Sequence, residues 1–223
     1  MAAQRLPSGP MPYKLVIFDL DGTLADSFAW FLANVNSVAD KFGFRRVADE
    51  EIEVLRHAGP RELLAHLKVP RWKLPRISRH MRKLKAEHTG IALFPGVDDM
   101  LQELVARGIA VAMVSSDHET NVRRTLGPTN AARIGHFACG ASAFGKAAKF
   151  KRVMRRAGVS AADTLAIGDE VRDLEAARKA GIAFGAVAWG FADPRALIAR
   201  GTDEFFAAVH DIPARLFACG KHA

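Results

Sequence analysis

Residues 14–24 read KLVIFDLDGTL, and this stretch decides the fold. It begins with the short apolar run Lys14–Phe18, which is followed at once by Asp19, Asp21 and a Gly-Thr pair. A run of this length that is closed by a turn is typical of a buried strand in a parallel sheet. We therefore expect a strand that carries two carboxylates at its carboxyl end.

Three more apolar runs of the same form occur further along the chain, at Ala110–Val114, Thr164–Ile167 and Ala183–Val187. Apolar residues recur at the spacing of amphipathic helices over Val97–Arg107, Ala147–Ala157, Leu174–Ala180 and Pro194–Ala199. This alternation of strands and helices predicts an α/β fold with a doubly wound parallel sheet.

One long segment breaks the alternation. Residues 26–92 contain no convincing strand, and their helix-like stretches are Phe28–Phe42, Glu50–Ala58, Glu62–Leu67 and Trp72–Glu87. We expect an α/β core made of residues 13–25 and 93–210, with a helical insert at 26–92 after the first strand. Residues 1–12 are predicted to form a flexible N-terminal tail.

The formal net charge of +8 is concentrated in this insert. Ten Lys or Arg residues lie between Arg56 and His88, against only Glu62 and Glu87. A local basic field attracts anions, such as phosphorylated metabolites or nucleic acid. A solvated helical surface is the plainer interpretation. Trp72 is the only aromatic side chain within the basic stretch, which argues against stacking on single-stranded nucleic acid.

Cysteine content and hydropathy indicate the compartment. Cys139 and Cys219 are the only cysteines, too few for a disulfide framework. No stretch approaches the roughly 18 apolar residues of a membrane span, and residues 1–12 lack the apolar run of a signal peptide. We expect a soluble, cytoplasmic protein with no membrane partner, whose oligomeric state the sequence does not indicate.

Ligands of an open parallel sheet bind outside the carboxyl ends of its strands, so the ends of the apolar runs are the places to look for chemistry. Asp19 and Asp21 stand at the first such end. One carboxylate can attack phosphorus to give an aspartyl phosphate, and a second can protonate the leaving oxygen and later activate water. An ordinary Asp-Gly turn after a buried strand is the alternative.

Further along the chain, Ser115 and Ser116 supply hydroxyl groups and Lys146 supplies an ammonium group. Ser115 and Ser116 end the second run, where a hydroxyl and free N–H groups can hold phosphate oxygens, although Ser is also a common helix N-cap. Lys146 opens a helix, and a positive charge there offsets the repulsion between a phosphoryl group and an attacking carboxylate. Lys149 lies one helical turn later. An ordinary surface lysine is the alternative interpretation both for Lys149 and for Lys146 itself.

The third run, Thr164–Ile167, leads through Gly168 into Asp169, and Asp173 follows four residues later. If a helix begins near Asp169, the two carboxylates face one side of it. Such hard oxygen ligands suit Mg²⁺, which also binds substrate phosphate. Acidic residues that only complement the helix dipole are the alternative.

Taken in this order, these residues resemble the haloacid dehalogenase superfamily of phosphohydrolases, over nearly the whole chain from Lys14 to about Ala208. The family pattern is Asp-x-Asp-Gly-Thr, then a Ser or Thr after the second strand, then a Lys, then Gly-Asp-x-x-x-Asp. The resemblance is to the phosphoglycolate phosphatase-like branch. It implies a magnesium-dependent phosphatase with a Rossmann-like core, which hydrolyses a small phosphorylated metabolite.

The resemblance also implies roles for individual residues. Asp19 would be the nucleophile and Asp21 the general acid and base; phosphate would be held by Thr23, Ser115, Ser116 and Lys146, and the metal by Asp19, Asp21, Asp169 and Asp173. The insert would be the family's helical cap. We expect Arg56 and Arg61, beside the loop Gly59-Pro60, to read a second anionic group of the substrate.

The sequence departs from the family pattern at two positions, and two alternative functions stay open. Lys146 is followed by Ala rather than the frequent Pro, which leaves Lys149 as an alternative, and Glu170 stands where a small residue is frequent. Asp21 favours phosphoryl chemistry over dehalogenation. A sugar-phosphate mutase would use the same residues. A non-catalytic module that binds through the basic cap, even to nucleic acid, is less favoured because every catalytic position is present.

Overall fold

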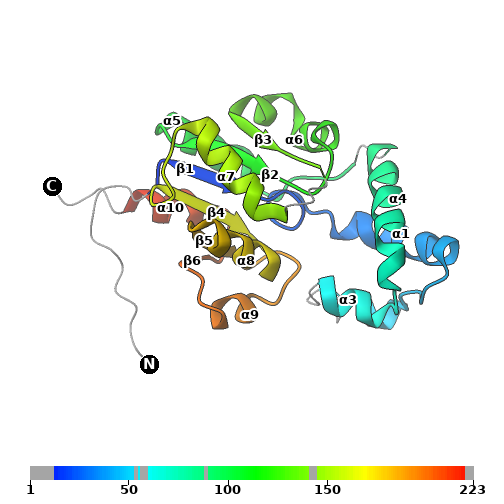
Figure 1. Ribbon diagram of the computed structural model, residues 1–223. Helices are drawn as coiled ribbons and strands as arrows, with labels where there is room; N and C mark the ends of the chain where they lie inside the picture. Colours follow the sequence, from blue (N-terminus) through cyan, green and yellow to red (C-terminus); the bar gives the residue numbers. More distant parts are fainter. Residues whose placement is uncertain (1–12, 53–54, 56–59, 88–89, 141–144, 219–223) are drawn as a thin grey trace.

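The predicted first strand forms as β1 (Leu15–Phe18), in the middle of a six-stranded parallel sheet. The sheet has the order β3-β2-β1-β4-β5-β6, so the chain winds outward from β1 to one edge and then returns to the other side of β1. The structure, a computed structural model, describes residues 13–52, 55, 60–87, 90–140 and 145–218, and the expected tail at 1–12 lies outside these residues. The predicted doubly wound α/β fold is confirmed (Figure 1).

The remaining strands are β2 (Ala110–Val114), β3 (His136–Ala138), β4 (Thr164–Gly168), β5 (Ala183–Val187) and β6 (Glu204–Phe206). The predicted runs became β1, β2, β4 and β5. The two edge strands, β3 and β6, have three residues each and were not predicted, because so short a run carries no readable periodicity.

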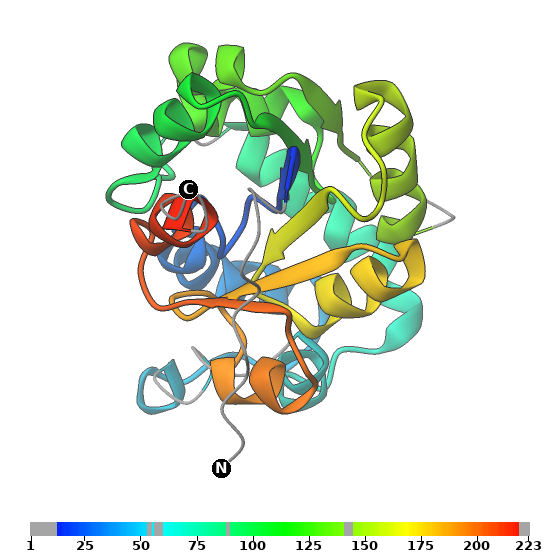
Figure 2. The same cartoon turned by 90° about the vertical axis from the view of Figure 1, so that its left-hand side faces the viewer.

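Helices cover both faces of the sheet (Figure 2). One face packs against α5 (Val97–Ala106), α6 (Glu119–Arg133) and α10 (Asp211–Ala218); the other packs against α7 (Gly145–Ala157), α8 (Val171–Ala180) and α9 (Pro194–Ala199). Successive residues of β1 alternate between the two, since Val16 and Phe18 lie in the first hydrophobic core and Leu15 and Ile17 in the second. The core continues past residue 210, its expected end, because α10 packs on α5.

The insert forms helices α1 (Phe28–Phe42), α3 (Pro60–His66) and α4 (Leu74–Glu87), with 3-10 turns η1 (Asp49–Glu51) and η2 (Arg71–Lys73). Its described residues contain no named strand. A small separate hydrophobic core, which includes Val35 and Leu67, holds these helices together. They lie beside the sheet rather than on either of its faces (Figure 1).

The two connections between core and insert run side by side. Ala25 and Leu93 form an isolated antiparallel bridge, and the N–H of Asp26 donates to the carbonyl of Ala92 at 2.9 Å. The chain therefore enters and leaves segment 26–92 through two adjacent stretches of backbone. None of the described helices has the length and apolar content to cross a membrane.

Candidate active site

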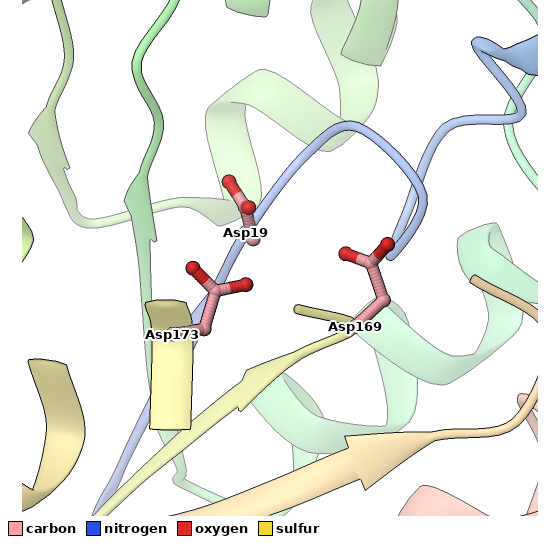
Figure 3. Close-up of side chains that lie close together, drawn as sticks. All are labelled: Asp19, Asp169 and Asp173. Carbon is pink, nitrogen blue, oxygen red and sulfur yellow. The ribbon is translucent and has the colours of Figure 1, made fainter. Parts of the chain in front are cut away.

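Three carboxylates meet where β1 and β4 end. These strands are parallel neighbours, with Phe18 opposite Ile167, so Asp19 and Asp169 emerge next to each other at the point where the strand order reverses. Asp173 comes from the first turn of α8 (Figure 3). All three side chains are buried, and they offer carboxylate oxygens within 4.8 Å of one another.

Lys146, in the first turn of α7, lies between two of these carboxylates. Its Nζ is 2.7 Å from Asp19 Oδ2 and 2.7 Å from Asp173 Oδ1. Burial disfavours the charged form of Asp19, but the cations of Lys146 and Arg172 prevail and hold the pKa of Asp19 below its usual value. Asp19 is thus kept as a carboxylate, the form in which it can act as a nucleophile.

Lys149 has a different position from Lys146. Its Nζ donates to the backbone carbonyl of Ser115 at 2.6 Å and to that of Gly140. It therefore ties two loops of the core together, and it forms no ion pair with Asp19. Of the two lysines that the sequence left open, Lys146 is the one that faces the predicted nucleophile.

Asp169 is held by hydrogen bonds to both of its oxygens. The hydroxyl of Thr23 donates to Oδ1 at 2.9 Å, and the N–H of Phe191 donates to Oδ2 at 2.8 Å. Gly22, at φ 76°, and Gly190 pass so close that a Cβ on either would overlap Asp169. The hydroxyl of Thr23, which the family resemblance assigns to phosphate, thus donates to Asp169 in this structure, and Thr23 is fully buried. Its assignment to phosphate stays a prediction.

The two predicted serines differ in exposure. Ser115 is buried, and its hydroxyl accepts a hydrogen bond from the N–H of Asp117 at 3.1 Å, as in a turn that leads into a helix. Ser116 is exposed and lines the cavity described below. Both lie at the carboxyl end of β2, beside β1.

The charges of the site leave room for a divalent cation. Four buried carboxylates and two cations meet here: Asp19, Asp169, Glu170 and Asp173 with Lys146 and Arg172. With all four carboxylates ionised, the group would carry two uncompensated negative charges, and burial together with the neighbouring carboxylates therefore raises the pKa of Asp169 well above its usual value. A divalent cation would balance these two charges, and hard oxygen donors are the ligands that Mg²⁺ prefers.

A cavity of about 300 Å³ opens between the insert and the core. Asp21 borders it from the core, and Arg82 and Lys85 border it from α4. Its apolar wall includes Phe31 and Met81. A small organic group that is attached to a phosphate at Asp19 would fit a pocket of this size and mixed polarity.

Two side chains of the cavity, Lys85 and Arg82, could not be singled out from the sequence, because they are two of ten similar cations. Lys85 Nζ is 2.6 Å from Asp21 Oδ1 and 3.1 Å from Asp117 Oδ2. Arg82 has a buried Nε that has no hydrogen-bond partner among the described residues.

The two arginines that the sequence proposed for substrate reading cannot be placed. Arg56 lies outside the described residues. Arg61 belongs to α3, but its side chain lies outside the part that the structure describes. Their assignment stays a prediction.

The chain is similar to a known family of hydrolases and to individual members of it. The family described as haloacid dehalogenase-like hydrolase matches residues 16–187. A phosphoglycolate phosphatase of Synechococcus elongatus is 31% identical over 192 residues, which cover 85% of this chain and 91% of that protein. One of Pseudomonas syringae pv. tomato is 28% identical over 84% of this chain and 74% of its own length.

Solved structures show the same fold. A crystal structure of a putative phosphoglycolate phosphatase from Lactobacillus plantarum matches with a TM-score of 0.78 at 20% identity, over 92% of this chain and 100% of that one. CbbY from Rhodobacter sphaeroides, in complex with xylulose-(1,5)bisphosphate, matches with a TM-score of 0.67 at 23% identity, over 92% and 99% of the two chains. The chain therefore belongs to the haloacid dehalogenase-like hydrolase family, as a phosphoric monoester hydrolase of its phosphoglycolate phosphatase-like branch.

Proposed function

We propose that this protein is a magnesium-dependent phosphatase that hydrolyses 2-phosphoglycolate, or a similarly small phosphate ester with a second anionic group, through an aspartyl phosphate on Asp19. The cytoplasmic location expected from the cysteine content belongs to the same proposal. The observation that carries the mechanism is the position of Asp19. It lies buried at the end of β1, paired with Lys146 at 2.7 Å and beside a cavity that Asp21 borders.

Asp19 and Asp21 divide the chemistry between them. A carboxylate oxygen of Asp19 attacks phosphorus, the bond from phosphorus to the ester oxygen breaks, and the leaving oxygen takes a proton from the carboxyl group of Asp21. A water molecule then attacks the phosphorus of the aspartyl phosphate and gives a proton to the Asp21 carboxylate. The bond to Asp19 breaks, which releases inorganic phosphate and restores both side chains.

The other core residues place and neutralise these groups. Lys146 is positioned to hold phosphoryl oxygens next to Asp19, and Ser115 and Ser116 lie at the adjacent strand end. Mg²⁺ would be held by Asp19, Asp169, the backbone carbonyl of Asp21 and, in support, Asp173. When bound, it supplies positive charge that offsets the repulsion between the nucleophile and the phosphoryl group.

We propose that the helical insert, residues 26–92, acts as a cap that selects the substrate. Its helix α4 brings Arg82 to the cavity, and Arg82 forms no ion pair with any described residue. Lys85 and Arg172, which also line the cavity, are already paired with carboxylates. Among the described cations of the cavity, Arg82 is therefore the one left for a second anionic group. Such a group is the carboxylate in 2-phosphoglycolate, the compound in the names of the curated relatives.

A substrate panel tests the proposal. Release of inorganic phosphate is measured from 2-phosphoglycolate, ethyl phosphate and glucose 1-phosphate, with added Mg²⁺ and after removal of metal with a chelator. We expect magnesium-dependent release, with 2-phosphoglycolate preferred over ethyl phosphate, which has the same leaving-group skeleton but no second charge. Transfer of the phosphoryl group between positions of the sugar would instead indicate a mutase, and no turnover of any ester would refute the proposal.

A further inference from the structure

We propose that Lys85, on the insert, is a positioning residue that holds Asp21 in place for proton transfer. The inference rests on the proposed function, which makes Asp21 the general acid and base. It adds a component from the other part of the molecule, because Lys85 belongs to α4 whereas Asp21 follows β1.

Lys85 differs from the other cations of the insert in its burial. It is the only Lys or Arg among the described side chains of the insert that is buried, and 7% of its side chain is exposed. Exposed neighbours such as Lys83 project from the same helix into solvent. Burying an ammonium group is costly unless carboxylates compensate it, and here Asp21 and Asp117 raise the pKa of Lys85 despite its burial.

The contact leaves half of the Asp21 carboxylate free. Lys85 Nζ donates to Oδ1 at 2.6 Å, whereas Oδ2 accepts no hydrogen bond from any described residue. The Asp21 side chain is 29% exposed and borders the cavity. One oxygen is thereby anchored, and the other is available to exchange a proton with the leaving oxygen and with water.

The ammonium group itself is held in place by the docking of α4 on α6. Asn121 Nδ2 donates to the carbonyl of Arg82 at 3.2 Å, and Arg124 donates to the carbonyl of Ala86 at 2.5 Å. Asn121 also donates to Asp117 Oδ1 at 2.9 Å, which fixes the second partner of Lys85. These bonds surround Lys85 on both sides along the helix, so the placement of Asp21 depends on the insert being docked.

Without Lys85, Asp21 loses its only hydrogen-bond donor among the described side chains and can rotate about its side-chain torsions. A misplaced general acid slows the reaction only when the leaving oxygen needs a proton. A poor alkyl leaving group needs one, whereas 2,4-dinitrophenolate leaves as a stable anion. Dependence on the leaving group therefore separates positioning from general damage to the fold.

The test compares Lys85→Met with the wild-type chain and with Lys83→Met, an exposed control two residues away on the same helix. We expect Lys85→Met to lower kcat/KM by about 100-fold for 2-phosphoglycolate and for ethyl phosphate, and by less than about threefold for 2,4-dinitrophenyl phosphate. Lys85→Arg, which restores a cation, recovers most of the loss. Lys83→Met behaves like the wild type on all three esters.

Equal losses on the alkyl and dinitrophenyl esters, or no loss on either, would overturn the inference. Should Lys85→Met fail to fold, Lys85→Gln is measured in its place, with the same two outcomes. A wild-type chain that hydrolyses none of the esters refutes the proposed function instead. The two proposals therefore fail through different observations.

Discussion

The α/β core and the helical insert place their charged side chains by different means. In the core, Asp19 and Asp169 follow two hydrogen-bonded neighbouring strands, so the register of the sheet fixes the distance between them. In the insert, Arg82 and Lys85 are two of several cations along α4, and the way α4 docks on α6 decides which of them turn inward. In the proposed mechanism, the core accordingly carries the reaction and the insert carries selection and alignment.

The largest effect is expected from the core, at the nucleophile. Asp19→Asn replaces the attacking carboxylate with an amide, which is a very weak nucleophile at this position. We expect phosphatase activity on every ester to fall by a factor on the order of 10⁴ or more. The measurement is the rate of phosphate release from 2-phosphoglycolate and from 2,4-dinitrophenyl phosphate.

The matched control is Asp99→Asn, an exposed aspartate in the first turn of α5. It should keep wild-type rates, and both variants should keep the wild-type circular dichroism spectrum. Substantial turnover by a folded Asp19→Asn chain would mean that the core does not carry the chemistry in the way proposed.

The second-largest effect is expected at Lys146, and it distinguishes this lysine from Lys149 in the same helix of the core. Lys146→Met removes the cation beside Asp19, and loss of such a stabilising group typically lowers kcat by about 10²–10³-fold. Lys149→Met removes the donor to the carbonyls of Ser115 and Gly140, and leaving such groups unsatisfied costs about 1–3 kcal/mol of stability.

Steady-state kinetics and thermal melts on both variants make the comparison. We expect the larger kinetic defect in Lys146→Met and the larger loss of melting temperature in Lys149→Met. The reverse pattern would show that Lys149, rather than Lys146, binds the phosphoryl group. The sequence leaves that alternative open because Lys146 is not followed by Pro.

The sequence predicts much of the core, because a parallel sheet links sequence order to position. Once Lys14–Phe18 is a strand, the residue after it lies at the edge where ligands bind, and the same argument places Asp169. The partners within this site could not be predicted in the same way. The bond from Thr23 to Asp169 and the close passage of Gly190 depend on how turns pack, and neither has a sequence pattern of its own.

Helix α6 shows another limit on what a sequence predicts. It was not among the expected helices, because Gly127 and Pro128 interrupt it and read as a turn. The structure holds a kinked helix there, with Gly127 at φ 72°. Because α6 carries Asn121, which docks α4, the contact between Lys85 and Asp21 could not be derived without it.

The smallest effect is expected in the insert, where it concerns the choice of substrate rather than the reaction itself. Arg82→Met removes the free guanidinium from the cavity. A hydrogen bond to a charged group is worth about 1.5–3 kcal/mol, so kcat/KM for 2-phosphoglycolate should fall about tenfold or more. Ethyl phosphate, which has no second charge, should be turned over at the wild-type rate, and so should both esters by the exposed control Arg79→Met.

The same assay compares Arg82 with the pair that the sequence proposed. Neutralising Arg56 and Arg61 together should raise the KM for 2-phosphoglycolate more than for ethyl phosphate if the loop at Gly59-Pro60 reads the second anionic group. If instead only Arg82→Met affects 2-phosphoglycolate more than ethyl phosphate, the second anionic group is bound by α4. Should neither change discriminate, the insert does not select for charge, and the division of roles between core and insert would need to be abandoned.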